Sequence, residues 1–164
     1  MKKYTLLTAI ILVSLSSFAQ ETETQPLSFN IGGELAVPVS NLSNISSFGF
    51  GISALGEYRV VEAFSVTLSA GYIHFFGKSF GGYTAPSLGQ VPLLAGGRYY
   101  FIKNVYASGQ LGISIFNKGL GSGFTYVPGI GAKFSNLDAT LKYMGASVEG
   151  GTLSNISLRF AYAF

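Results

Sequence analysis

His74 is the one histidine of this 164-residue chain, so a search for catalytic chemistry starts there. A histidine base works with a hydroxyl nucleophile beside it and a carboxylate that orients its ring. Phe75 and Phe76 follow His74, so no serine lies close behind it. Glu149 is the one carboxylate in the longer loops predicted below, at the end of the chain's strands where His74 also lies. We therefore expect an interfacial histidine and no catalytic residues.

Side chains that bind metals or cofactors are scarce. Cysteine is absent, which excludes thiolate metal sites, disulfides and a lipoprotein anchor. The segment Gly119–Gly123 is rich in glycine like a phosphate-binding loop, but neither a strand-to-helix junction nor a Gly-Lys-Ser/Thr sequence follows it. We expect neither a metal ion nor a cofactor.

A second group of chemically active residues consists of charges of both signs, which fall among small residues. They are Glu34, Glu57, Arg59, Arg98, Lys133, Asp138, Lys142 and Arg159. Unpaired charges are costly in a narrow protein interior, so we predict that these side chains form ion pairs and hydrogen bonds with one another. They would form either a polar core that fixes strand register or a gated path for small ions. We favour the polar core, because the alternation described below predicts a barrel of eight strands, and side chains fill barrels of that size.

Strands must position these charges, because the sequence alternates with a period of two. The end of the chain shows the alternation most clearly, since small or charged residues occupy every second position. The large apolar residues between them are Ile156, Leu158, Phe160, Tyr162 and Phe164. A water-soluble protein rarely ends on such a bare aromatic row, whereas a lipid-facing strand needs no protein cover.

The same alternation predicts an all-β chain of eight antiparallel strands closed into an up-and-down transmembrane barrel. The predicted strands are 27–37, 48–59, 64–72, 91–101, 105–115, 124–134, 137–143 and 156–164. Short connections at 61–63, 102–104 and 135–136 alternate with longer ones at 38–47, 74–90, 117–123 and 144–154. Short connections are typical of the periplasmic side of outer-membrane barrels, and longer loops of the exterior.

Aromatic residues give an independent indication of a bilayer, because they gather toward the strand ends around an aliphatic belt. The group at the short-turn ends is Phe29, Tyr58, Phe64, Tyr99, Phe101, Phe134, Tyr162 and Phe164. The group at the long-loop ends is Phe48, Phe50, Tyr72, Phe124, Tyr126 and Tyr143. A lipocalin-like barrel with its apolar face inward is the alternative. It is disfavoured because only 10% of the residues are charged, against roughly 25% in soluble domains.

The N-terminus predicts export. Lys2 and Lys3 precede an apolar run at 6–13, and Ser17 and Ala19 are small residues where a signal peptidase cuts, so residues 1–19 resemble a signal peptide. We expect a flexible lead-in at 20–26 and a single barrel domain at 27–164. Lys2 and Lys3 also supply two of the three net positive charges, so nothing indicates nucleic-acid binding.

The alternating segments Val91–Phe101 and Phe124–Phe134 and the terminal Leu158–Phe164 resemble the small eight-stranded outer-membrane β-barrels, which include OmpX-like proteins and the OmpA transmembrane domain. The resemblance implies the outer membrane of a Gram-negative bacterium, with contacts to membrane lipid and lipopolysaccharide. It also implies that Phe160, Tyr162 and Phe164 are the signal read by the barrel-assembly machinery. Members of the family serve as adhesins, envelope stabilisers, narrow channels or lipid-modifying enzymes.

The loop predicted at 74–90 is the candidate contact site for an external surface or protein ligand. Its candidate contact residues are His74, Phe75, Phe76, Phe80 and Tyr83. This stretch could be an adhesive patch, or an extension of the two flanking strands above the membrane whose edge pairs with a partner's strand. It could also be a loop that packs over the barrel mouth. Lys78 and Lys118 could contact lipopolysaccharide phosphates.

We therefore expect an outer-membrane barrel with a structural or adhesion-like role and no enzymatic activity. A narrow pore or transporter for small or apolar solutes is the main alternative, and a lipid-A-modifying enzyme is the third. Pro92 and Pro128 should disturb strand pairing. Leu55, Leu94 and Val127 should point inward, against the polar pattern of that face.

Overall fold

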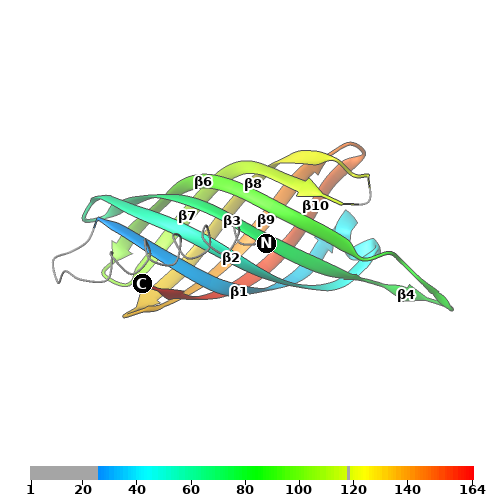
Figure 1. Cartoon of the computed structure of the whole chain (residues 1–164), viewed down its shortest axis with the longest axis horizontal. Helices are drawn as coiled ribbons and strands as arrows, with labels where there is room; N and C mark the ends of the chain where they lie inside the picture. Colours follow the sequence, from blue (N-terminus) through cyan, green and yellow to red (C-terminus); the bar gives the residue numbers. More distant parts are fainter. Residues whose placement is uncertain (1–25, 118) are drawn as a thin grey trace, which may run out of the picture.

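A closed barrel of eight antiparallel strands forms the molecule, as predicted (Figure 1). The computed structural model describes residues 26–117 and 119–164. The barrel strands are β1 (Leu27–Ser40), β2 (Ser46–Val61), β3 (Phe64–Gly77), β6 (Leu88–Ile102), β7 (Val105–Phe116), β8 (Ser122–Phe134), β9 (Leu137–Val148) and β10 (Gly151–Ala163). Each strand pairs with its neighbours in sequence, and β1 pairs with β10 to close the barrel. The predicted signal peptide and most of the lead-in lie outside the described residues.

The two ends of the barrel differ in how their strands are joined. At one end, here called the turn end, two residues join each pair of strands, at 62–63, 103–104 and 135–136. At the other, here called the loop end, the connections are 41–45, 78–87, 117–121 and 149–150. The first contains the short 3-10 helix η1 (Asn41–Asn44), and the second contains a hairpin of β4 (Ser79–Phe80) and β5 (Tyr83–Thr84). This hairpin projects beyond the barrel (Figure 1).

The predicted loops were too wide. Residues 38–40, 74–77, 88–90, 144–148 and 151–154 belong to strands, so the barrel extends further at the loop end than the sequence indicated. Serine, asparagine and glycine are frequent there, and these residues favour turns when only local preference is considered. In a closed barrel, pairing with both neighbouring strands outweighs that preference.

The apolar face of every strand is outside. Leu68, Leu93, Leu111 and Leu141 remain 69%, 41%, 57% and 49% exposed, which excludes the lipocalin-like alternative. The aromatic residues predicted for the two girdles are exposed as well, apart from half-buried Tyr143. The Tyr143 hydroxyl lies 2.8 Å from Ser154 Oγ. No helix in the described chain is long and apolar enough to cross a bilayer.

The two prolines predicted to disturb strand pairing, Pro92 and Pro128, each lie in a gap of the ladder on one side of their strand. Pairing between β3 and β6 passes from Ala70–Leu93 to Ile73–Gln90, and so skips Pro92. Pairing between β8 and β9 passes from Tyr126–Gly145 to Gly129–Lys142, and so skips Pro128. The predicted irregularity is confirmed, because proline has no N–H to donate.

Candidate functional site: the lumen and the loop end

The lumen near the turn end is built around Arg98 on β6. Its Nη1 lies 3.0 Å from Glu57 Oε2 on β2 and 2.8 Å from Asp138 Oδ2 on β9. All three side chains are buried. A buried charge is stabilised only when it is paired, and here a single guanidinium pairs with two carboxylates from different strands.

Two tyrosines complete this cluster. Tyr100 donates its hydroxyl to Glu57 Oε1 at 2.7 Å, and Tyr106 donates its hydroxyl to Asp138 Oδ1. The Arg98 guanidinium also lies over the Tyr106 ring, 4.3 Å from its centroid, in a cation–π contact. The sequence pattern placed both tyrosines on the inner face but gave no indication that they would bind the charges. The one feature of the sequence that could have revealed this role is that both tyrosines occupy inward positions close to charged residues.

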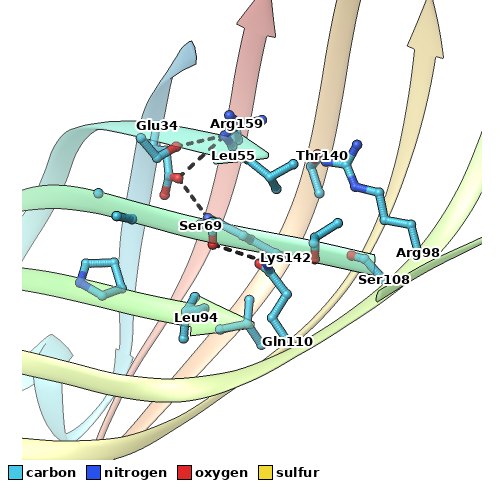
Figure 2. Close-up of a pocket in the computed structure, with 16 residues that line it drawn as sticks. Glu34, Leu55, Ser69, Leu94, Arg98, Ser108, Gln110, Thr140, Lys142 and Arg159 are labelled. Atoms are coloured by element: carbon cyan, nitrogen blue, oxygen red, sulfur yellow. Dashed lines mark hydrogen bonds and ion pairs between the residues drawn. The ribbon is translucent and has the colours of Figure 1, made fainter. Parts of the chain in front are cut away.

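A second ion-pair cluster lies further along the lumen. Lys142 Nζ on β9 lies 2.8 Å from Glu34 Oε1 on β1. Arg159 on β10 lies 3.8 Å from the same oxygen and donates to Ser53 Oγ and Asn30 Oδ1 at 2.8 and 2.6 Å. Figure 2 shows Glu34, Lys142 and Arg159 turned toward one another inside the barrel. Arg159 Nη1 also lies 3.9 Å from Asp138 Oδ2, which connects the two clusters.

Six of the eight predicted network residues therefore meet in ion pairs, and two do not. Arg59 lies half-buried near the turn end, with its guanidinium 5.4 Å from the centre of the Tyr100 ring. Lys133 is half-buried beside the turn at 135–136, and it takes part in none of the ion pairs found among the described residues. Both stand close to the strand ends, where a long side chain can reach water and needs no buried partner.

The lumen at the loop end holds a cluster of buried apolar side chains, which we call the loop-end plug, beside the buried polar side chains of Gln90, Ser114 and Thr125. Its buried members are Ala36, Leu42, Ile73, Phe75, Leu88, Leu94, Phe116, Val127, Met144 and Ala146. Leu42 comes from η1 and is fully buried, so the first loop turns inward and closes the mouth. Leu55, Leu94 and Val127 point inward as predicted. The larger plug was missed, because half of its members lie in the segments predicted as loops.

Little space is left between these groups. A cavity of about 20 Å³ lies in the middle of the lumen, lined by residues that include Glu34, Lys142 and Arg159 (Figure 2). A space of this size holds about one water molecule. The side chains that line this cavity therefore leave little free volume between them.

The predicted contact residues 74–76 belong to β3 and not to a loop, and they face different ways. Phe75 is fully buried in the loop-end plug, so it cannot contact an external partner. Phe76 is exposed and stacks on Phe48, with ring centroids 5.4 Å apart. The His74 ring forms an edge-to-face pair with Phe76, and its Nδ1 lies 3.5 Å from the Tyr72 hydroxyl. The side chains of Phe80 and Tyr83, and Lys118, lie outside the described part of the structure.

The β4–β5 hairpin is held at its base. Lys78 donates its backbone N–H to Ile45 O at 2.9 Å and its ammonium to Ser43 O at 3.4 Å, which links the hairpin to the loop containing η1. At the tip, Gly81 and Gly82 have φ values of 51° and 96°. Two consecutive positive φ angles suit a type I′ hairpin turn, and glycine adopts them without strain. In the parts of the chain that are described, no three His, Cys, Asp or Glu residues come together as a metal site.

Solved structures share this architecture. The chain superposes on the crystal structure of Ail, the attachment invasion locus protein of Yersinia pestis, with a TM-score of 0.60 and 14% identity over 84% of this chain and 97% of that one. The fold is that of the small eight-stranded outer-membrane β-barrels. Ail in a phospholipid bilayer nanodisc gives a TM-score of 0.62 at 15% identity, over 84% of this chain and 98% of that chain.

A de novo designed transmembrane β-barrel superposes with a TM-score of 0.53 at 14% identity, over 88% of this chain and 100% of that chain. No family model and no curated protein matches the sequence. At these identities the likeness establishes the fold and leaves activity open, since one fold hosts many functions.

Proposed function

We propose that this chain is an integral outer-membrane barrel with a side-chain-filled lumen, whose role is structural or in surface contact at the loop end. The supporting observation is the filling of the lumen by two connected ion-pair clusters and an apolar plug. A permeating ion would have to displace paired charges and then cross the apolar plug, and both steps are costly.

Planar-bilayer recordings test the filled lumen against the pore alternative. We expect no steady single-channel steps from the refolded protein. Steady steps that change when Arg98 is replaced would overturn the proposal and favour a narrow channel. Heat-modifiable migration on a gel is the accompanying control, because it shows that the recorded protein is folded.

We assign surface contact to the β4–β5 hairpin and to the exposed, stacked rings of Phe48 and Phe76 near its base. The hairpin projects from the barrel and presents strand edges to which an extended peptide could add. Cells that display the full barrel and cells that display a variant with 79–84 replaced by Gly-Gly should differ in attachment to the partner surface. Lys103→Ala, at the turn end, is the matched control. Equal attachment by the hairpin variant would exclude this site.

Ail has been crystallised with sucrose octasulfate, a heparin analogue. The loop end of this chain offers little to such a polyanion, because its described charged residues are Lys78 and Glu149. Three described cations, Arg59, Lys103 and Lys133, lie toward the turn end. We therefore expect a partner recognised through backbone and aromatic contacts, and weak binding of sucrose octasulfate in a titration at physiological salt.

The further expectations from the sequence fit this role. Phe160, Tyr162 and Phe164 are exposed on the outer face of the last strand or just beyond it, where the barrel-assembly machinery could read them. We also propose that residues 1–19 direct export and that the inserted barrel contacts lipopolysaccharide. A role in lipid modification has no support from His74, whose recorded contacts are Tyr72 and Phe76. Lipid A should be unchanged on overexpression.

A further inference from the structure

Glu34 and Arg159 in the middle of the lumen, like Asp138 nearby, have buried side-chain atoms without a hydrogen-bond partner among the described residues. Glu34 Oε2 and Arg159 Nη1 are both buried and make no hydrogen bond. Their side chains are 2% and 3% exposed. A buried polar atom left without a partner costs roughly 1–3 kcal/mol, and more when the group is charged.

Direct contact between these two residues is incomplete. Arg159 Nε lies 3.8 Å from Glu34 Oε1, which is too long for a hydrogen bond. Arg159 donates its hydrogen bonds to Ser53 and Asn30, and not to Glu34. The second carboxylate oxygen of Glu34, Oε2, accepts no hydrogen bond from the described residues. Polar groups separated by more than about 3.5 Å are often joined by a water molecule.

The cavity of about 20 Å³ is lined by both residues. Its other lining groups include Lys142, Ser53, Thr140 and Gln110, so the site is polar and offers both donors and acceptors. Gly71 and Pro92 line it too, where the ladder between β3 and β6 is interrupted. A buried water needs a volume of about 10–15 Å³ and two to four polar partners, and this cavity meets both conditions.

We propose that the cavity between Glu34 and Arg159 is a binding site for one ordered water molecule, which accepts from Arg159 Nη1 and donates to Glu34 Oε2. Water is favoured over an ion because the charges around the site balance. Glu34, Glu57 and Asp138 supply three negative charges. Arg98, Lys142 and Arg159 supply three positive charges. An added ion would leave the buried cluster with a net charge, which a low-dielectric interior disfavours.

A crystal structure of the refolded full barrel, grown in rubidium bromide, separates these occupants. We expect one density peak at about 2.6–3.2 Å from both Glu34 Oε2 and Arg159 Nη1, without anomalous signal. Anomalous signal at the peak would overturn the proposal in favour of an ion. A site without density would overturn it as well.

A second measurement uses the protein in lipid nanodiscs. Magnetisation transfer from water to the Arg159 guanidinium should be observed by NMR in the wild type. It should be lost in Ser69→Val, which adds apolar volume to the wall of the cavity. Ser147→Val, on an exposed part of β9, should leave it unchanged. Transfer that persists in Ser69→Val, or is absent from the wild type, would contradict the site.

Discussion

The guanidinium of Arg98 lies 2.8 Å from the carboxylate of Asp138, although β6 and β9 share no ladder. The contact therefore crosses the lumen, and a further bond from Arg98 to Glu57 brings in β2. Strands that never pair along their edges are thus connected by buried charge. The pairing holds the strands in one register, because a slip of one residue would move the charge to the lipid face.

Arg98→Met should be strongly destabilising. The substitution leaves Glu57 buried without a cation and Asp138 with only the longer contact to Arg159, and breaking a buried ion pair costs about 3–5 kcal/mol. Urea unfolding in detergent, followed by the folded band on a gel, measures the loss. Arg59→Met is the matched control, because Arg59 is half-buried and pairs with no carboxylate in the described structure. We expect a change below about 1 kcal/mol for the control. Equal losses in the two variants would show that the buried ion pairs do not hold the barrel together.

Gly131→Ala should disrupt the tyrosine beside it. A Cβ at Gly131 would overlap the ring and hydroxyl of Tyr106 on the neighbouring strand. Displacement of Tyr106 would remove its bonds to Asp138 and Thr140 and its contact with Arg98. We expect a loss of about 2–4 kcal/mol from these bonds together with overpacking. Gly109→Ala should be almost neutral, since nothing lies within 4 Å of a Cβ there. A neutral result for Gly131→Ala in the same unfolding assay would contradict the close packing.

Leu68→Arg tests whether the apolar face meets lipid. Leu68 lies in the middle of β3 and is 69% exposed on the outer face. Arginine at the bilayer midplane costs about 2–4 kcal/mol, and near the interface about 0–1 kcal/mol. Val61→Arg, at the turn end of β2, should therefore be tolerated. Unfolding from lipid vesicles measures both variants. A Leu68→Arg protein as stable as Val61→Arg would mean that this face does not contact hydrocarbon.

Leu42→Ala should loosen the loop-end plug. Leu42 is fully buried among apolar side chains, and truncating a buried leucine costs about 2–5 kcal/mol. Ile45→Ala changes an exposed residue of the same loop and should alter stability by less than about 0.5 kcal/mol. Faster amide exchange at 41–45 in Leu42→Ala would accompany the loss. Equal stability of the two variants would indicate that Leu42 does not close the mouth.

Alternation predicted which residues face outward and inward along the strands, including inward Leu55, Leu94 and Val127. It failed at the loop end, where Ile73 to Gly77 continues β3 and Gly151 to Ser154 begins β10. Serine, glycine and asparagine in these segments carry local turn signals. An extension of the strands on either side of 74–90 was among the predicted alternatives, and the structure shows it. The turn at Gly81–Gly82 was not located, although two adjacent glycines between strands are a recognised signal for such a turn.

Partners across the lumen could not be predicted from the sequence. The two-residue period places Arg98, Asp138 and Lys133 on the inner face alike. Arg98 forms an ion pair with Asp138, whereas Lys133 lies opposite Asp138 in the β8–β9 ladder and takes part in none of the ion pairs found among the described residues. Pairing across the lumen depends on the stagger of strands around the barrel, which the period of a single strand does not contain.

The sequence by itself determined that the chain forms eight alternating strands with an apolar and a polar face, because strand periodicity and bilayer chemistry act locally. The tertiary structure decided how the polar faces meet. It placed Arg98 between Glu57 and Asp138, turned Phe75 and Leu42 into the plug, and left one water-sized cavity between Glu34 and Arg159. These contacts join residues far apart in the chain, and closure of the barrel with its particular stagger is what brings them together.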